Sequence, residues 1–362
     1  MVEFGNRLSF VLGNYWGQCQ GGAELQARYL QQEALGQGWI THYCFLSNEN
    51  HIENNQETTL YPIRQKKFWS KLGNIKYPYA RDVLQALKEM KPDVIYQRAS
   101  SSLTGVTAYY ALRHKCKFIF HVAHDKDVDT IFFPWSKPWL IPEYKFMQYG
   151  IRNADTIIAQ TRFQASQLQK NYNRTAIVIP NGHPVPDDCE KPLHPITVLW
   201  IANWKPVKQP EIFVQLVKEM ACNKDIRFIM IGRTDRYDAL VAQAHQLNIK
   251  VMGEITNEQV NDLLDQSHIL INTSQQEGFS NTFIQAWMRR VPVLSLQVDP
   301  DNTIKNNQIG YCSGTFSQLI KDTRELLTNH DLRSTMGHNA RQYGIKHHSL
   351  NNINKIIEVM TR

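Results

Sequence analysis

The sequence lacks the features that mark several large protein classes. No apolar run approaches the roughly 20 residues needed to cross a bilayer, so no membrane-spanning helix is expected. The first residues carry one early arginine and no small-residue cleavage site, which predicts a first strand and not a signal peptide. Six cysteines are scattered without short paired spacings, which excludes a zinc ribbon or a disulfide scaffold and fits reduced thiols in a cytosol.

Motifs of common nucleotide and hydrolase sites are missing as well. There is no G-x-G-x-x-G after a strand, no G-x4-G-K-[ST] and no G-x-S-x-G, so a dinucleotide site, a P-loop and a nucleophile elbow are not expected. Asp-x-Asp spacings occur only in HDKDVD and DPD. Short pairs of this kind are common by chance, so we expect no metal site.

The composition indicates a globular protein with a basic surface. The chain has 362 residues, about twice the length of an ordinary domain, and 42% of them are hydrophobic. Forty lysines and arginines against 33 acidic residues give a net charge of +7. This excess favours anionic partners such as nucleotides or an acidic membrane surface.

Short strand-like runs alternate with longer helical stretches along the whole chain. Runs such as RLSFVL (7–12) and KFIFHV (117–122) lie in the first half, and TVLWI (197–201) and ILIN (269–272) in the second. This alternation predicts two doubly wound Rossmann-like α/β domains with a cleft between them. The proline-rich segment 183–195 is predicted to link domains at 1–182 and 196–345, followed by a C-terminal helix at 346–362 that could cross back to the first domain.

One basic segment, Arg64–Arg81, departs from this pattern. It mixes arginines and lysines with Phe68, Trp69, Tyr77 and Tyr79 and has no acidic residue. Such a mixture suits peripheral contact with an anionic membrane or glycan, and a solvated surface segment is the alternative.

The strongest local signal is EGFSNTFIQAW (277–287), which follows a predicted strand and opens a helix. The first turn at Ser280, Asn281 and Thr282 offers backbone amides to a phosphate, and Gly278 permits a close turn. Glu277 stands where it could accept hydrogen bonds from hydroxyl groups of the molecule that carries the phosphate. A capped helix with a polar first turn is the alternative.

Other loops after predicted strands supply weaker candidates. Gly21 and Gly22 open a helix after the first strand, and their lack of side chains permits a close backbone approach. A histidine just past a strand, His124, could meet a substrate hydroxyl or be structural. In the second half of the chain, the loop after the predicted strand at 197–201 contains Asn203, Lys205 and Lys208. A lysine there could pair with a diphosphate or start a solvated helix.

The order of these pieces resembles the family 4 glycosyltransferases, which are retaining enzymes with the GT-B architecture. The resemblance rests on GGAE, HD, IPNG, W-x-x-x-K, EGFSNTFIQAW and MGHNARQY, and it covers nearly the whole chain. It implies transfer of a sugar from a nucleoside diphosphate donor with retention at the anomeric carbon, without a metal or other cofactor. The donor is expected mostly in the second domain and the acceptor mostly in the first.

The resemblance also assigns roles to single positions. Gly21 and Gly22 match the glycine loop beside the diphosphate, and His124 the histidine that approaches the donor sugar. Lys208 matches the lysine on the diphosphate, and Glu277 the first acid of the Glu-x7-Glu motif. The donor set expected on this basis is Gly21, Gly22, Asn203, Lys205, Lys208, Gly253, Glu277, Gly278, Phe279, Ser280, Asn281, Thr282 and Gln285, with His124, Lys208 and Glu277 as the catalytic residues.

Two positions depart from the family pattern. Gln285 stands where the second acid is usual, and Asn203 where an arginine usually helps to neutralise the leaving diphosphate. These changes favour one alternative: a catalytically weakened homologue that binds a sugar nucleotide or glycan as a partner subunit. A GT-B epimerase or phosphorylase is a further alternative. The resemblance and the basic segment together suggest a cytoplasmic enzyme of cell-surface polysaccharide synthesis, acting on a glycan or lipid-linked acceptor at the inner face of a membrane, with no nucleic-acid partner.

Overall fold

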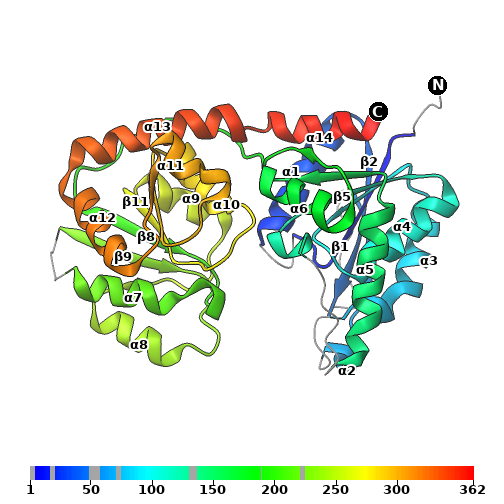
Figure 1. Ribbon diagram of the computed structural model, residues 1–362, viewed down its shortest axis with the longest axis horizontal. Helices are drawn as coiled ribbons and strands as arrows, with labels where there is room; N and C mark the ends of the chain where they lie inside the picture. Colours follow the sequence, from blue (N-terminus) through cyan, green and yellow to red (C-terminus); the bar gives the residue numbers. More distant parts are fainter. Residues whose placement is uncertain are drawn as a thin grey trace. The chain divides into compact units, whose positions relative to one another are not determined.

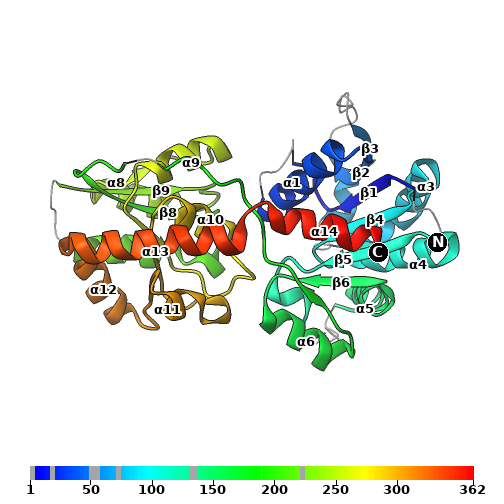
Figure 2. The same ribbon diagram turned by 90° about the horizontal axis from the view of Figure 1, so that it is seen from above.

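The chain forms two compact units, each built on a parallel β-sheet (Figures 1 and 2). A computed structural model describes residues 5–16, 21–48, 58–70, 75–129, 137–188, 190–220 and 225–362. The first unit comprises residues 1–182 together with 350–362, and the second comprises residues 183–349. Among the described residues, no helix is both long and apolar enough to cross a bilayer.

The first unit has a seven-stranded sheet in the order β3-β2-β1-β4-β5-β6-β7. Every neighbouring pair is parallel, which requires crossover connections between the strands. The chain turns from one side of β1 to the other between β3 and β4, so β1 and β4 flank the switch point of this sheet. The strand bounds are β1 (Arg7–Leu12), β2 (Ile40–Ser47), β3 (Thr58–Arg64), β4 (Val94–Arg98), β5 (Lys117–His121), β6 (Thr156–Ala159) and β7 (Ile177–Val178).

Helices cover both faces of this sheet because successive strand side chains point to opposite sides. Leu8, Phe10 and Leu12 face a cluster with α1 and α14, whereas Val11 faces a cluster with α3, α4, α5 and α6. Burial of each large apolar side chain contributes about 1.5–3 kcal/mol. The helices are α1 (Gly22–Gly36), α2 (Lys67–Ser70), α3 (Ala80–Met90), α4 (Ser102–His114), α5 (Ile141–Asn153), α6 (Arg162–Tyr172) and α14 (Asn351–Thr361).

The second unit has a six-stranded parallel sheet in the order β10-β9-β8-β11-β12-β13. Its switch point lies between the adjacent central strands β8 and β11. The strand bounds are β8 (Ile196–Ile201), β9 (Ile226–Ile231), β10 (Lys250–Val251), β11 (Ile269–Asn272), β12 (Val293–Ser295) and β13 (Gly310–Cys312).

Two apolar clusters fill the two faces of this second sheet. Trp200 faces the cluster that includes α7 and α12, and its neighbour Leu199 faces the cluster that includes α10. The helices are α7 (Pro210–Glu219), α8 (Asp238–Gln246), α9 (Asn257–Asp265), α10 (Asn281–Met288), α11 (Thr303–Asn307), α12 (Phe316–Thr328) and α13 (His330–His348).

The segment predicted as a linker packs on the second unit. Lys191 donates to the carbonyl of Leu264 at 3.0 Å, and the carbonyl of Pro186 accepts from Arg341 at 2.9 Å. The chain then leaves α13 and returns to the first unit, where α14 buries Ile353, Ile356 and Ile357.

Candidate functional site

The candidate site of the second unit lies at the switch point of its sheet. The loop after β8 carries a 3₁₀ turn at Pro206–Lys208, and the loop after β11 leads to α10. Because β8 and β11 are parallel neighbours, their carboxyl ends bring these two loops to one edge. Ligands of open parallel sheets bind at such an edge.

Lys208 and Glu277 meet at this edge although 69 positions separate them in sequence. The Lys208 ammonium forms an ion pair with Glu277 Oε1, and the Ser274 hydroxyl donates to the same oxygen at 2.8 Å. Both partners are largely buried, with side-chain exposures of 22% and 13%. An ammonium has three N–H groups, so two of those on Lys208 stay available to an anionic ligand.

A buried hydrogen-bond chain holds the two loops together. The indole of Trp200 donates to Thr273 Oγ1 at 2.8 Å, and the Thr273 hydroxyl donates to the carbonyl of Lys208 at 2.7 Å. The backbone N–H of Gln275 donates to the carbonyl of Val207 at 2.9 Å. The backbone around Lys208 is therefore fixed by the residues between β11 and Glu277.

Helix α10 begins at Asn281, four residues after Glu277. The N-cap residue Ser280 makes no side-chain cap, and its hydroxyl is 2.8 Å from the hydroxyl of Thr282. Asn281 Oδ1 lies 3.2 Å from the ring of His183. Phe279 is turned into the core against Trp287 and His348, so its side chain does not belong to a donor site and only its backbone can contribute.

Gln285 is buried and engaged by a neighbouring helix. Its amide nitrogen donates to Asn257 Oδ1 at 2.8 Å and to Asn261 Oδ1 at 2.9 Å, both on α9. Only the amide oxygen of Gln285 can therefore serve as an acceptor for a ligand.

The loops after β8, β9 and β10 are bonded to one another. Asn203 Oδ1 accepts from the backbone N–H of Arg233 at 3.1 Å, and the N–H of Gly232 donates to the carbonyl of Gly253 at 2.8 Å. A Cβ at Gly232 would lie 1.9 Å from the carbonyl oxygen of Ala202, so a glycine is required there. This arrangement places a second cation, Arg233, beside Asn203.

In the first unit, Gly21 and Gly22 stand at the start of α1. The Glu24 side chain folds back over this start, since a Cβ at Gly21 would lie 2.2 Å from Glu24 Oε2. The other Glu24 oxygen accepts from Asn14 at 3.0 Å. The start of α1 thus already faces the carboxylate of Glu24. Residues 17–20 of this loop lie outside the described part of the chain.

His124 follows β5 and caps a short 3₁₀ turn. The ring nitrogen Nδ1 accepts from the backbone N–H of Lys126 at 3.2 Å, and the backbone N–H of His124 donates to Asp127 Oδ2 at 3.0 Å. The ring is therefore oriented by the local turn with Nδ1 as acceptor, which makes Nε2 the protonated nitrogen when the ring is neutral.

One cation of the first unit, Arg98, was not singled out from the sequence. Arg98, at the end of β4, donates to Asn181 of the IPNG motif at 2.5 Å and contacts the ring of His121. Burial and this nearby cation lower the pKa of His121 well below its ordinary value, so the ring is neutral. A charged residue that closes an apolar strand, as in PDVIYQR, is the signal that could have identified Arg98.

Lys76 belongs to the basic segment but is turned inward. Its ammonium would lie 2.6 Å from a Cβ at Gly13, directly after β1. Burial lowers the pKa of Lys76, and the charges of Glu143, Glu24 and Asp127 oppose that shift. Tyr79 is buried as well, so the exposed remainder of the segment includes Arg64, Lys66, Phe68 and Arg81.

The candidate residues thus fall into two sets. Gly21, Gly22 and His124 lie in the first unit, and the positions from Asn203 to Gln285 lie in the second. Within the second unit, Lys208 and Glu277 come together, and α10 begins four residues after Glu277. No group of three or more His, Cys, Asp or Glu side chains in the described ranges is placed to hold a metal ion.

Two family models match consecutive parts of the chain. A model described as Glycosyltransferase Family 4 matches residues 20–185, and one described as Glycosyl transferases group 1 matches residues 195–329. Each unit is therefore matched separately, and together the models cover most of the sequence.

Sequence relatives match shorter stretches. An uncharacterised glycosyltransferase of Methanocaldococcus jannaschii is 24% identical over 210 residues, which are 56% of this chain and 58% of that protein. The capsular polysaccharide biosynthesis glycosyltransferase CapM of Staphylococcus aureus is 30% identical over 78 residues, 21% of this chain and 20% of that one. The chain thus spans less than two thirds of the length of either relative.

Solved structures match over the full length. Anabaena HepE, solved in complex with UDP-glucose, has a TM-score of 0.74 at 15% identity, with 98% of both chains covered. Sucrose-phosphate synthase of Thermosynechococcus elongatus has a TM-score of 0.76 at 13% identity, again over 98% of both. WaaG, a glycosyltransferase involved in lipopolysaccharide biosynthesis, has a TM-score of 0.74 at 15% identity over 98% of this chain and 99% of that one. At these low identities, the TM-scores show a shared fold and no more.

Proposed function

Because the chain belongs to the family 4 (group 1) glycosyltransferases and has the GT-B fold, we propose that it transfers a sugar from a nucleoside diphosphate sugar to a hydroxyl group of a glycan or lipid-linked acceptor. We further propose that the transfer proceeds with retention and without a metal ion. The observation that carries the proposal is the Lys208–Glu277 pair at the switch point of the second sheet, next to the start of α10.

In this proposal, Lys208 stabilises the leaving group. Negative charge grows on the diphosphate as its bond to the sugar breaks, and the two N–H groups that Lys208 does not give to Glu277 can donate to it. The amides of the first turn of α10 supply further donors. These groups are held in place before the reaction, so their reorientation adds little to the barrier.

Glu277 is proposed to hold the sugar. Oε1 is engaged by Lys208 and Ser274, which leaves Oε2 to accept from a sugar hydroxyl. The acceptor hydroxyl then attacks the anomeric carbon on the face that the diphosphate leaves. The bond from carbon to diphosphate breaks, the bond to the acceptor oxygen forms, and the acceptor proton passes to the departing diphosphate.

Asn203 stands where the family usually has an arginine that helps to neutralise the leaving diphosphate, so another residue must supply that charge. We propose that Arg233 or Lys205 supplies the second cation. Asn203 anchors the backbone of Arg233, whose side chain lies 3.9 Å from both Asp235 and Glu254 and is half-exposed. Such exposed pairs contribute little stability, so a diphosphate can compete for the guanidinium. A binding subunit without turnover is the second candidate, which the residues at Asn203 and Gln285 favour.

The test is a turnover assay with UDP-glucose first, since UDP-glucose is bound in the HepE structure, followed by other nucleotide sugars. We expect Lys208→Ala and Glu277→Ala to lower kcat by about 10²–10³-fold, the loss typical of one transition-state donor. Lys218→Ala, an exposed lysine on α7, serves as the control with unchanged kcat.

The outcomes separate the two candidates. Full activity in both site variants contradicts the assignment of Lys208 and Glu277. Tight nucleotide-sugar binding without release of nucleoside diphosphate, with or without cell-envelope acceptors, supports the binding subunit instead. The proton coupling of the anomeric position in the product, measured by NMR, tests retention.

We also propose a role in cell-surface polysaccharide synthesis with peripheral membrane contact. WaaG and CapM are named for lipopolysaccharide and capsular polysaccharide, and Phe68 is 65% exposed beside the exposed cations Arg64 and Lys66. An aromatic side chain flanked by cations suits an anionic bilayer surface.

Co-sedimentation with phosphatidylglycerol vesicles tests this contact. Phe68→Ser and Lys66→Glu should each reduce the bound fraction, whereas Lys346→Glu, which makes the same charge change on α13, should not. Equal binding of all variants, or no binding at low salt, contradicts the contact.

A further inference from the structure

A pocket of about 490 Å³ lies in the second unit at the edge of the sheet opposite Lys208 and Glu277. His268 immediately precedes β11 and Leu193 lies shortly before β8, so both line the pocket from the amino ends of the two central strands. Lys208 and Glu277 follow the carboxyl ends of the same strands. The pocket is therefore separate from the proposed donor site, although α10 runs from one to the other and ends beside Arg290.

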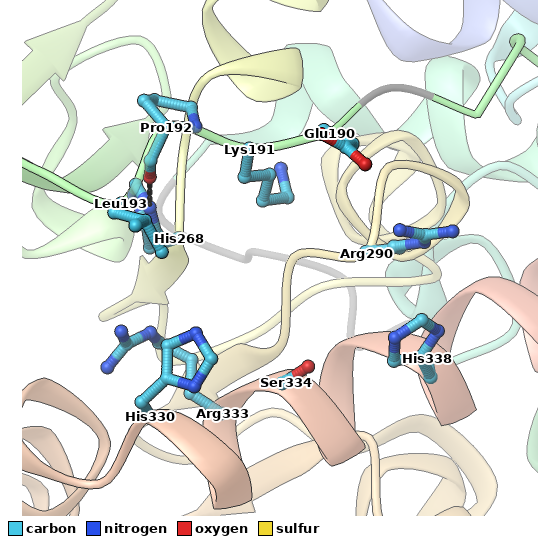
Figure 3. A pocket seen from close by; sticks show the side chains of 10 residues that line it. All are labelled: Glu190, Lys191, Pro192, Leu193, His268, Arg290, His330, Arg333, Ser334 and His338. Carbon is cyan, nitrogen blue, oxygen red and sulfur yellow. Dashed lines mark hydrogen bonds between the residues drawn. The ribbon is translucent and has the colours of Figure 1, made fainter.

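Cationic side chains dominate the lining (Figure 3). Lys191, Arg290 and Arg333 oppose one carboxylate, Glu190, which gives the lining a net charge of +2 before any histidine is protonated. Asp188 pairs with Arg290 but also with an additional cation outside the lining, Arg341, so it does not cancel this excess. A phosphate monoester carries a charge near −2 at neutral pH, which matches the lining.

Arg333 is the decisive residue. Its side chain is buried, with 7% of the residue exposed, and no carboxylate among the described residues pairs with it. Nη1 donates to the carbonyls of Leu326 and Leu327 at 2.5 and 3.4 Å, which leaves Nε and Nη2 as further donors. Burial also lowers the pKa of Arg333. Leu326 and Leu327 lie in the last turn of α12, whose partial negative charge offsets part of the cost of burying this cation, and an anion in the adjoining pocket would offset more of it.

Of the other lining side chains, His268 is bonded within the protein, whereas Ser334 and His338 can contact a ligand. His268 is neutral, since burial lowers its pKa to about 4, and it fixes the wall by donating to the Pro192 carbonyl at 2.7 Å. Ser334 and His338 stand four positions apart on α13 and thus share one face of that helix (Figure 3). Neither side chain bonds to another described residue, so both can contact a ligand.

We propose that this pocket binds a small phosphorylated molecule of sugar-phosphate size, with its phosphoryl group on Arg333 and its remaining part against Ser334 and His338. Its volume falls within the range of small-molecule sites. A free phosphate ion shares the phosphoryl chemistry, whereas a sugar phosphate also fills the rest of the pocket.

Isothermal titration of the full chain with glucose 6-phosphate and, separately, inorganic phosphate tests the proposal. We expect saturable binding that Lys208→Ala leaves unchanged, because Lys208 lies at the opposite edge of the sheet. Ser334→Glu and His338→Glu each introduce a carboxylate on an exposed helix face and should weaken binding at least about tenfold. Lys346→Glu makes an acidic change on another part of α13 and should have no effect.

Each result decides the matter. Loss of binding in Lys208→Ala places the ligand in the donor site and overturns the proposal, as does unchanged binding in both pocket variants or no saturable binding of either probe. Tighter binding of glucose 6-phosphate than of phosphate supports a sugar-phosphate pocket, and equal binding supports a phosphate site alone. Circular dichroism and nucleotide-sugar turnover of the pocket variants check the fold and keep this test independent of the proposed activity.

Discussion

Lys208 and Glu277 restrict each other's side chains at the carboxyl edge of the second sheet. Their ion pair, with Ser274 on the same carboxylate oxygen, holds both groups in defined rotamers. Ordering a flexible side chain on binding costs about 0.5–1.5 kcal/mol. Lys208 and Glu277 are already ordered in the folded protein, so most of this cost does not arise when a ligand binds. The same logic applies to Thr273, whose hydroxyl holds the Lys208 backbone. The site is therefore preorganised residue by residue.

His268 predicts a pH dependence of stability. Its pKa of about 4 in the folded protein lies below the 6.5 of an exposed histidine, so the unfolded chain binds more protons between these values. Stability consequently rises with pH across the window from about 4 to 6.5, by at most ~1.4 kcal/mol per pH unit. Acidification through this window removes that stability.

Urea unfolding of the wild type and His268→Gln at pH values on either side of this window measures the effect. The unfolding midpoint of the wild type should fall more on acidification than that of His268→Gln, because the variant lacks the titrating ring. His121 is present in both proteins and contributes equally. Identical pH profiles would show that His268 titrates normally in the folded protein.

At the level of elements, the loops after β8, β9 and β10 act as one block. Gly232, with φ of +130°, lets the loop after β9 pass against the carbonyl of Ala202. The backbone N–H of the next residue, Arg233, is bound by Asn203. A side chain at Gly232 would therefore displace the loop that positions both candidate phosphate contacts of this block, Asn203 and Arg233.

Gly232→Ala should lower stability by roughly 2–4 kcal/mol and weaken nucleotide-sugar binding, since the clash involves backbone and cannot be relieved by a rotamer change. Gly314→Ala is the matched control: its φ is also positive, at +72°, but a Cβ there meets nothing within 4 Å. It should cost only about 1 kcal/mol and leave binding unchanged. Equal losses in the two variants would refute the role of close loop packing.

The elements that could be predicted from sequence are those with short, continuous apolar runs. Runs such as RLSFVL and TVLWI coincide with β1 and β8, which are central strands buried on both faces. The strands β2 and β3 were not predicted, because β2 mixes Thr41 and His42 with apolar residues and β3 contains Pro62. A proline is tolerated there because β3 is an edge strand.

At the scale of the whole molecule, the sequence predicted two Rossmann-like α/β domains, and both units have the expected parallel sheet. Structural neighbours such as WaaG share this fold. From the residues alone the candidate site was predicted only as separate loops, and it was the family resemblance that joined them into one donor set. The Lys208–Glu277 contact depends on the adjacency of β8 and β11, and the engagement of Gln285 depends on α9. The inward position of Lys76 depends on tertiary packing around Gly13, which no local pattern encodes.

Helix α14 completes one of the apolar cores of the first unit. Ile357 is buried in the same cluster as Phe10 and Leu30, so Ile357→Ala should cost about 2–5 kcal/mol of stability. Urea unfolding of the variant measures this loss. Glu358→Ala, on the exposed side of the same helix, should change stability by less than about 1 kcal/mol. A small effect of Ile357→Ala would show that α14 is not an integral part of the first unit.

The return of α14 sets the order of events during synthesis. The second unit is one contiguous stretch and can acquire its tertiary structure as soon as it has left the ribosome. The first unit, although translated earlier, waits with an uncovered apolar surface until residues 350–362 have emerged. Nascent chains stalled before residue 350 should therefore be the form most readily captured by chaperones.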